Sequence, residues 1–461
     1  MDGASCPGAR PDERGKAAVK RKKTALLALA ALFALLLCGC FAQPMEELYA
    51  LPRQSDDYNN LQQAIDAVMA AGTTYCAPAT GSNQQPVQLA DLDGDGEDEA
   101  IVFLKASDEK PLKLYLFDLV DGAYQNIAVI EGSGSMFDRV EYVELDGEPG
   151  AEIVVGRQVS DQVLQALGVY ALRDGHIVEL LSCNYTEYTV ADLTNDGVSD
   201  LFVLRFDAEE RTGVAELYTY NNGMMEREPE ASMSTGVNTV KRIISGSIGG
   251  NVPAVLVAST YDDASILTDV FAVRDGTFCN LTAGSNSATT VRNYYVYATD
   301  IDADGVIELP DPELLPSAQG ADSGDAYWII HWYSLSLDGS RTRKMTTYHN
   351  YSGGWYVILP DAWGTSLTVS RLEEYSGVRG YVFSQWYGAG REPEEIFTIY
   401  AFTGDDRAAL AAADGRFVLG EKGDVTYAAS LGTAPRAREL TREGLITRFG
   451  YIRVDWNTGE M

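Results

Sequence analysis

One nine-residue segment recurs five times in this chain, and a short apolar run follows each copy directly. The first copy, residues 91–99, reads DLDGDGEDE and is followed by AIVFL. The later copies begin at positions 144, 192, 245 and 300, so the spacings between successive copies are 53, 48, 53 and 55. A regular period of this length is typical of repeat architectures, in which each unit packs against the next. The repeat therefore limits the fold more than any other feature.

A second marker keeps the same phase, namely the tight-turn dipeptides that close β-hairpins. They are Asp121-Gly122, Asp174-Gly175, Asn222-Gly223, Asp275-Gly276 and Asp338-Gly339. Measured from the first position of the acidic segment before it, the offset is 30 for each of the first four dipeptides and 38 for the fifth. Between the markers lie runs rich in aromatic and β-branched residues, such as 113–117 and 126–130. Each unit is therefore predicted to contain about four strands.

Four-stranded units at this spacing predict an all-β fold, a β-propeller whose blades bury their faces against one another. Continuing the period beyond residue 338 predicts about seven blades, and the propeller is expected to span 86–461. Strands are expected in the last part at 355–359, 367–369, 380–383, 396–400 and 451–454. The repeats are clear only to about residue 350. A six-bladed propeller, or five units followed by a separate β domain, therefore stays open.

The acidic segments carry the residue types that bind a hard cation. In the first copy, carboxylates stand at positions 1, 3, 5 and 9, and Gly stands at position 6. Calcium in proteins takes about six to eight oxygen ligands, many of them carboxylates. The second copy, 144–152, has Pro149 at position 6, and the fixed φ of proline puts calcium there in doubt. The fourth copy, 245–253, has no acid and is expected to bind no ion.

These loops and the strands after them resemble the FG-GAP and VCBS-type repeats of integrin-like β-propellers, in which a DxDxDGxxD loop holds calcium. The resemblance covers about residues 86–310. It implies that calcium is a structural cofactor, held by side chains at positions 1, 3, 5 and 9 and by the carbonyl at position 7. The implied ligands are Asp91, Asp93, Asp95, Glu97, Glu99, Asp192, Thr194, Asp196, Val198, Asp200, Asp300, Asp302, Asp304, Val306 and Glu308. Thr194 replaces an acid, so the third site is expected to bind calcium more weakly.

Two other interpretations of the acidic segments are open. An EF-hand or dockerin loop needs flanking helices and a ligand at position 12, which is Val102 in the first copy and Val203 in the third. Both lie in apolar runs, and Asp311 in the fifth copy lies between two prolines. Val102, Val203 and Asp311 therefore favour strands after the acidic segments over the flanking helix of an EF-hand. The remaining alternative is a solvated acidic turn that binds no ion.

The beginning of the chain has the pattern of a secretory signal, with a basic run at 20–23 and an uncharged apolar stretch at 24–39. That stretch is shorter than the roughly 20 residues of a spanning helix. Residues 37–40 read LCGC and resemble the lipobox of bacterial lipoproteins. The resemblance implies that 1–39 is a signal peptide and that Cys40 is lipidated. The expected location is extracytoplasmic, with the chain lipid-anchored to the bacterial cell membrane.

Residues 40–85 are expected to form a tether and one amphipathic helix. Asp57 is predicted to cap this helix, apolar residues follow at three- and four-residue spacing, and Gly72 marks its end. Its expected role is packing against the domain that follows.

The charge of the chain limits its partners. The whole sequence carries 35 basic and 67 acidic residues, a net charge of −32. Residues 1–39 contain seven basic and three acidic residues, so the remainder has 28 minus 64, or −36. Such a chain is not expected to bind nucleic acid, whose phosphates attract basic proteins. An anionic lipid surface would also repel it, so attachment to the membrane must come from the lipid.

Composition gives little support for catalysis. The chain has three His and no recognisable nucleophile or phosphate-binding motif. Cys76, Cys183 and Cys279 have no close spacing, and a disulfide between two of them is left open. Trp363 and Trp386 stand beside glycines and are predicted to be exposed as a ligand surface. The predicted function is therefore a non-catalytic surface lipoprotein that binds a protein or glycan partner, and the alternative is a carbohydrate-active enzyme on a propeller scaffold.

Overall fold

The structure is a computed structural model that describes residues 56–69, 72–159, 165–262, 264–284, 289–317, 326–375, 378–453 and 456. Residues 1–62 and 63–461 are separate units, and of the first unit only 56–62 are described. The predicted signal peptide at 1–39 and the lipidation site Cys40 lie outside the described residues. Within the described part of the chain, no helix is long and apolar enough to cross a membrane.

The predicted N-terminal helix is confirmed. Helix α3 (Asp56–Met69) begins one residue before the predicted cap, so Asp57 belongs to its first turn. Gly72 follows the helix with φ of 85°, and its N–H donates to the carbonyl of Met69 at 3.0 Å. A residue in this left-handed conformation is a common helix end, and glycine adopts it without strain.

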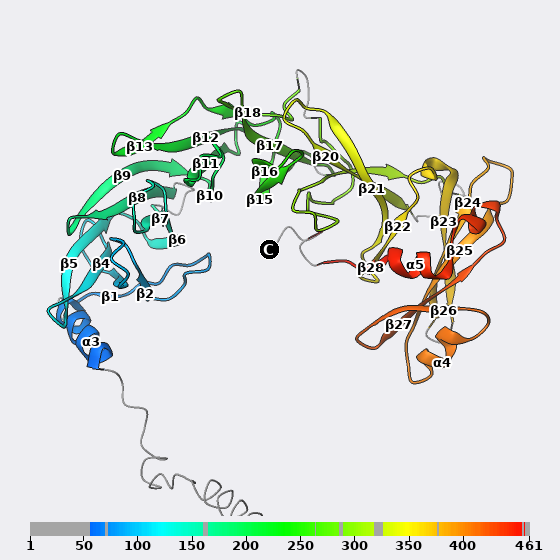
Figure 1. Cartoon of the computed structure of the whole chain (residues 1–461), viewed down its shortest axis with the longest axis horizontal. Helices are drawn as coiled ribbons and strands as arrows, with labels where there is room; N and C mark the ends of the chain where they lie inside the picture. The colour runs from blue at the N-terminus through cyan, green and yellow to red at the C-terminus, as the bar shows by residue number, and fades with distance from the viewer. Residues whose placement is uncertain are drawn as a thin grey trace, which may run out of the picture. The chain divides into compact units, whose positions relative to one another are not determined.

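The remaining described residues are all-β and form six antiparallel sheets (Figure 1). The first sheet contains β1 (Thr74–Tyr75), β2 (Val87–Ala90), β3 (Glu99–Lys105), β4 (Leu112–Val120) and β5 (Ala123–Gly132). The second contains β6 (Met136–Val143), β7 (Glu152–Gln158), β8 (Gln165–Arg173) and β9 (His176–Tyr185). The third contains β10 (Glu187–Ala191), β11 (Asp200–Asp207), β12 (Thr212–Asn221), β13 (Met224–Arg227) and β14 (Ala231–Ser232).

The other three sheets are built from the second half of the chain. The fourth contains β15 (Thr239–Ile248), β16 (Val252–Thr260), β17 (Ile266–Arg274) and β18 (Thr277–Asn280). The fifth contains β19 (Leu309–Leu314), β20 (Trp328–Leu335), β21 (Arg341–Asn350), β22 (Trp355–Leu359) and β28 (Phe449–Tyr451). The sixth contains β23 (Leu367–Tyr375), β24 (Val378–Gln385), β25 (Glu394–Phe402), β26 (Phe417–Lys422) and β27 (Val425–Leu431). Short helices η2 (Gly364–Ser366), α4 (Arg407–Ala412), η3 (Pro435–Glu439) and α5 (Arg442–Arg448) connect these strands.

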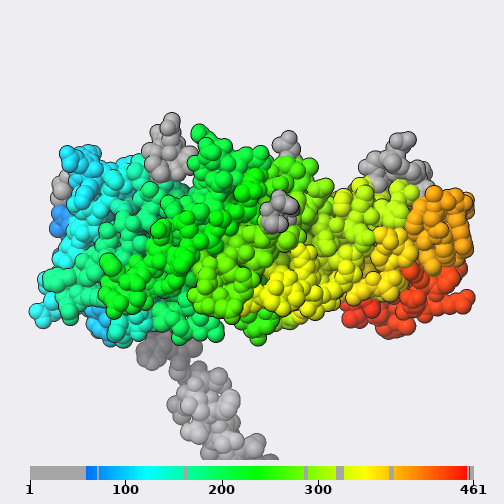
Figure 2. Space-filling model, turned by 90° about the horizontal axis from the view of Figure 1, so that it is seen from above, coloured from blue at the N-terminus to red at the C-terminus, as the bar shows by residue number. Residues whose placement is uncertain are grey.

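The hydrophobic cores lie between successive sheets, because alternate side chains of a strand point to opposite faces. In β11, Phe202 and Leu204 belong to a core shared with the fourth sheet, whereas Leu201 and Val203 belong to a core shared with the second. Similar shared cores join the first sheet to the second, the fourth to the fifth, and the fifth to the sixth. The same order of segments is visible on the surface (Figure 2). Strands β3, β7, β11 and β16 are therefore apolar on both faces, which explains the continuous apolar runs in the sequence.

The turn dipeptides close hairpins, as predicted. The first four join the last two strands of a repeat unit with two residues at positive φ, for example 53° at Asp121 and 79° at Gly122. Two positive φ values are the mark of the type I′ turn that suits the right-handed twist of paired strands. In the fifth turn only Gly339 has positive φ, and the connection between β20 and β21 is longer.

The predicted number of seven units is not found, since the described residues form six sheets. The extrapolation assumed two further units after residue 338, but residues 341–359 complete the fifth sheet. The sixth sheet extends from 367 to 431 because α4 is inserted between its strands. The chain then returns, and β28 pairs with β22 at the edge of the fifth sheet. The sixth sheet is not a separate domain, because it shares a core with the fifth. Each sheet is open within the described residues, so closure into a propeller remains a prediction.

Burial of His349 in the fifth sheet makes stability depend on pH. Its ring stacks on Trp456 with centroids 5.5 Å apart, and burial lowers the pKa of His349 to about 3. The unfolded chain takes up this proton near pH 6.5, while the folded chain does not. Stability should therefore be lost as the pH falls below about 6.5.

We predict that the urea midpoint of the wild-type protein falls relative to that of His349→Phe as the pH is lowered from 6.5 to 4.5. Urea titrations at several pH values would measure it. Identical pH slopes for the two proteins would contradict the assignment.

Candidate metal loops and groove

The acidic segments are turns that lead into the second strand of a repeat unit, or into β19 in the fifth unit. We number them along the chain. Loop 1 is 91–99, loop 2 is 144–152, loop 3 is 192–200, loop 4 is 245–253 and loop 5 is 300–308. Loops 1 to 4 therefore occupy equivalent places in the fold, each between two paired strands, and loop 5 precedes the edge strand of its sheet.

Loops 1, 3 and 5 share three hydrogen bonds that wrap the backbone around its own carboxylates. The N–H at position 6 donates to the acid at position 1: Gly96 to Asp91 at 3.1 Å, Gly197 to Asp192 at 3.0 Å and Gly305 to Asp300 at 2.9 Å. The N–H at position 2 donates to the acid at position 9: Leu92 to Glu99 at 2.7 Å, Leu193 to Asp200 at 2.8 Å and Ile301 to Glu308 at 3.2 Å. The N–H at position 7, in Glu97, Val198 and Val306, donates to Asp95, Asp196 and Asp304 at position 5. The sequence match therefore corresponds to one loop geometry.

Loop 1 gathers three of its predicted ligands. Carboxylate oxygens of Asp91, Asp93 and Glu99 lie within 4.8 Å of one another. Glu99 is 1% exposed, and burial raises its pKa to about 7. Burial also raises the pKa of Asp93, and the charge of Asp118 on β4 adds to both shifts. Buried carboxylates are costly unless a cation offsets their charge, so the donor set fits a hard cation such as calcium.

Loop 5 gathers Asp300, Asp302 and Asp304, whose oxygens also lie within 4.8 Å of one another. Glu308 is fully buried, its Oε1 has no hydrogen-bond partner among the described residues, and burial raises its pKa to about 7. This orphaned oxygen fits a site that takes a cation. Lys344 Nζ, however, lies 2.5 Å from Asp304 Oδ2 and would compete with the ion for that carboxylate.

Loop 3 has the shared geometry but does not form such a group among the described residues. Asp200 Oδ2 accepts hydrogen bonds from the N–H of Leu193, the N–H of Thr194 and the Thr194 hydroxyl. These bonds already stabilise the one buried carboxylate of the loop. The residues thus fit calcium less well here than in loops 1 and 5.

Loop 2 differs because Pro149 has no N–H to donate at position 6. Positive φ falls instead at Gly147 and Gly150. The carboxylate of Asp146 is only 2% exposed and pairs with the guanidinium of Arg173. The pairing of Asp146 with Arg173 is therefore a stronger reason than the φ of proline to doubt that loop 2 binds calcium. In loop 4 no acid exists, and Gly249 N–H donates to a carbonyl of the fifth sheet.

Loops of neighbouring sheets touch. The N–H of Ala151 donates to the carbonyl of Asp91 at 3.0 Å, and a Cβ at Gly94 would overlap Pro149. A Cβ at Gly147 would lie 3.5 Å from Val198 of loop 3. A cation in loop 1 would therefore fix the contact between the first two sheets as well as the loop itself.

The prediction that Trp363 is exposed is wrong. Trp363 is 2% exposed, and its Nε1 donates to Glu439 Oε2 at 3.1 Å. The neighbouring Gly364 begins the short helix η2, and this turn packs inward against the sixth sheet rather than outward. Trp386 is half-buried, and its N–H donates to the carbonyl of Ser366. The two residues therefore do not form an exposed aromatic surface.

The possible metal-binding groups among the described residues contain no histidine or cysteine. His331 is buried, and side chains of the fifth sheet hold both of its ring nitrogens, with Nε2 2.8 Å from Glu313 Oε2 and Nδ1 2.9 Å from Thr346 Oγ1. Cys76, Cys183 and Cys279 are all free, so no two of them form a disulfide.

A groove of about 1040 Å³ lies at the third sheet, at the end of the strands opposite to loop 3. Strand β11 starts at loop 3 and ends at Asp207, in the wall of the groove. The lining combines polar and apolar surface, and its apolar part comes from Tyr185, Phe206, Val214 and Met233. Its polar members include Asn184, Thr186, Arg205, Asp207, Glu209, Thr212, Glu230, Ser232 and Thr235. Its volume is in the range of small-molecule and oligosaccharide sites.

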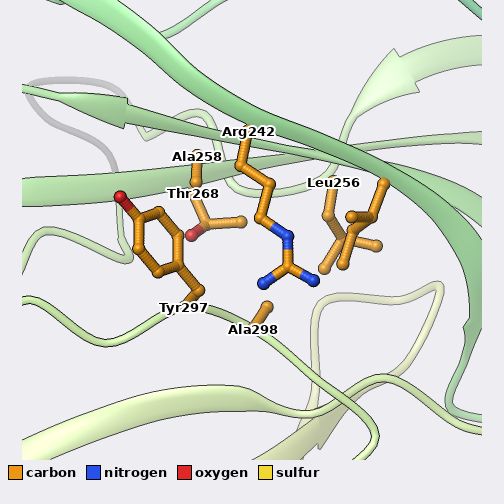
Figure 3. Close-up of a pocket in the computed structure, with 7 residues that line it drawn as sticks. Arg242, Leu256, Ala258, Thr268, Tyr297 and Ala298 are labelled. Atoms are coloured by element: carbon orange, nitrogen blue, oxygen red, sulfur yellow. The ribbon is translucent and has the colours of Figure 1, made fainter. Parts of the chain in front are cut away.

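A second cavity is far too small for a ligand. Its volume is about 10 Å³, and it lies between Arg242, Leu256, Thr268 and Tyr297 (Figure 3). The Arg242 guanidinium points into it, 5.8 Å from the centroid of the Tyr297 ring. This space holds about one water molecule.

Comparisons with known proteins do not show a family. No family model matches the chain, and no curated protein matches it. Among solved structures, the rhamnogalacturonan lyase YesW is 13% identical with a TM-score of 0.28, over 77% of this chain and 72% of that one. The Bacillus licheniformis rhamnogalacturonan lyase PL11 is 12% identical with a TM-score of 0.27, over the same shares. AofleA from Arthrobotrys oligospora is 11% identical with a TM-score of 0.22, over 68% and 82%. TM-scores this low support no conclusion about fold or activity.

Sequence analysis missed four features of this region: Asp118, Arg173, Lys344 and the groove. The first two precede the hairpin turns by three residues and by one residue. Each stands shortly before a recognisable turn, and hairpin register places both positions beside the loop. Their location near the loops could therefore have been predicted from the sequence. Lys344 and the groove had no such signal, because they depend on how distant segments pack.

We predict that excess calcium raises the melting temperature above its value in chelator. At a concentration about ten times Kd, one site adds about 1.4 kcal/mol. Asp93→Asn should lose part of the rise, and Glu148→Gln in loop 2 should keep it. Differential scanning calorimetry would measure this, and an unchanged midpoint in wild-type protein would remove the ion from the account.

Proposed function

We propose that this protein is a bacterial cell-surface lipoprotein whose calcium-stabilised FG-GAP/VCBS-type β-propeller binds a glycan or protein partner without catalysing a reaction. One observation carries the proposal. Loop 3 and the groove lie at opposite ends of β11, and loops 1 and 2 precede the equivalent strands of their own sheets. One end of the strands thus carries carboxylates that fit a structural ion, while the other end has room for a partner.

The arrangement of the cores supports a propeller. Five cores lie between two successive sheets, and three of the six sheets have all their strands in chain order. Such packing requires every blade to be covered on both faces by its neighbours. Closure of the ring would cover the outer faces of the first and last sheets in the same way.

The chemistry of the groove favours a glycan over an apolar ligand. Hydroxyl and amide side chains such as Thr212, Thr235 and Asn184 can donate and accept hydrogen bonds with sugar hydroxyls. The apolar part offers the half-buried ring of Phe206 to the faces of sugar rings. A protein partner is the alternative outcome of the test below.

Two of the three carboxylates of the groove, Asp207 and Glu230, have hydrogen-bond or charge partners within the third sheet, and this supports a non-catalytic role. Asp207 accepts hydrogen bonds from the N–H groups of Glu209 and Glu210. Arg205 pairs with the buried Glu216 and lies 3.8 Å from Glu230. A general acid or base needs a titratable group free to exchange a proton with substrate.

An extracytoplasmic location fits both the leader and the loops. A loop site of this kind, with affinity on the order of 10⁻⁴ to 10⁻³ M, fills where calcium is plentiful, as it is outside cells. The net charge of −36 beyond residue 39 would keep the chain away from anionic lipid. A lipid on Cys40 would then supply the attachment.

Lipidation is tested by labelling cells with palmitate. The wild-type protein should incorporate label and remain in the membrane fraction, and Cys40→Ala should do neither. Equal labelling of the two proteins, or none of the wild type, would contradict the lipoprotein assignment. Cys38→Ala is the matched control and should still be labelled.

Binding is tested on a glycan array, with reducing ends measured on any glycan that binds. We predict binding without release of reducing ends. Glu209→Lys and Thr235→Arg, both at exposed groove positions, should weaken binding at least tenfold. Asp424→Lys, exposed in the sixth sheet, is the charge-matched control and should bind normally. Release of reducing ends would overturn the non-catalytic assignment, and binding unaffected by the groove variants would place the site elsewhere.

A further inference from the structure

A positively charged side chain, that of Arg173 on β8, lies beside loop 2. The guanidinium of Arg173 pairs with the carboxylate of Asp146, which occupies position 3, where loop 1 has Asp93. Arg173 also lies over the ring of Tyr220 in the third sheet, 5.4 Å from its centroid. The Asp146 side chain is 2% exposed and the Arg173 side chain 33%, so the carboxylate is the buried partner of this ion pair. Removing one partner from such a pair leaves an uncompensated buried charge.

The hairpin beside each loop decides which charge is presented to it. Arg173 is the last residue before its turn and pairs with His176 after it. The equivalent residue beside loop 1 is Val120, which pairs with Ala123 across the equivalent turn. Val120 and Arg173 stand at equal offsets from the first positions of their loops, 91 and 144, so the register is the same.

Strand geometry places the side chain of Val120 on the face of β4 that Asp118 occupies. Residues two apart on a strand share a face, and Asp118 is two residues before Val120. Asp118 is near enough to Asp93 and Glu99 for its charge to act on both. In the second sheet, the residue equivalent to Asp118 is Ala171. The hairpin thus presents a carboxylate to loop 1 and a guanidinium to loop 2.

We propose that Arg173 takes the place of a metal ion in loop 2, and that in loops 1 and 2 the residue before the hairpin turn determines whether the loop binds calcium. The inference rests on calcium binding by loop 1 under the proposed function. Under this proposal, the contacts between neighbouring sheets are of two kinds, one balanced by calcium and one balanced by arginine. Loop 1 would depend on calcium in the surroundings, and loop 2 would keep its charge balance at every calcium concentration.

Transfer of the arginine tests the proposal. Val120→Arg places a guanidinium beside Asp93, and Val120→Leu adds bulk without charge. We expect Val120→Arg to bind one calcium ion fewer than wild type in equilibrium dialysis with ⁴⁵Ca, and Val120→Leu to bind the wild-type number. Asp146→Asn, which changes loop 2 itself, should also bind the wild-type number. Circular dichroism would confirm that each variant is folded.

Loss of Arg173 provides an independent readout in chelator, where no loop holds calcium. Arg173→Leu should melt at a lower temperature than wild type, and Arg173→Lys, which keeps the charge, should recover most of the difference. Equal losses in the two variants would show that Arg173 acts by packing and would overturn the proposal.

The outcomes separate this inference from the proposed function. Calcium binding that is unchanged by Val120→Arg, or reduced by Asp146→Asn, would overturn the inference alone. A wild-type chain that binds no calcium would overturn the calcium part of the proposed function and, with it, the inference.

Discussion

Repulsion between carboxylates at the junctions of the sheets is the constraint on which the rest of this structure depends. Each acidic loop turns its backbone around its own acids, and the loops of neighbouring sheets touch, as Ala151 touches Asp91. Packing two sheets together therefore concentrates negative charge, which must be balanced before the apolar faces can meet. The chain uses different solutions at different junctions: a site fit for calcium in loop 1, Arg173 in loop 2, Lys344 beside loop 5, and no acid in loop 4.

The same junctions explain why the strands after the loops are apolar on both faces. Leu201 and Phe202 are neighbours in β11 but belong to different cores, so each sheet contributes to the stability of two interfaces. A loop that fixes the entry of such a strand sets the position of both interfaces at once. Strand ends on the other side are free of this task, and there the groove opens beside Asp207. The two ends of the strands thus have different roles because the acidic loops lie at one end only.

Much of the fold could be predicted from the sequence because its signals are local and repeated. The spacing of Asp121-Gly122 and its copies located the hairpins, and the acidic segments located the turns before the second strands. The prediction was wrong where no repeat was present: the sixth sheet contains α4, and β28 returns to the fifth sheet. Trp363 shows the same limit, because a neighbouring glycine indicates a turn but not the direction in which the turn packs. For the loops, residue types predicted the ligands of loop 1, whereas the pairing of Asp146 with Arg173 required the register of a second hairpin.

Amide hydrogen exchange with and without calcium tests most directly the claim that calcium orders some junctions and not others. Added calcium should slow exchange in peptides that contain residues 92–98 and 301–307, and in the strands β3 and β19 after them. Peptides of loop 2 and loop 4 that lie away from those contacts should exchange at equal rates in both conditions. Uniform protection of all five loops, or of none, would contradict the account.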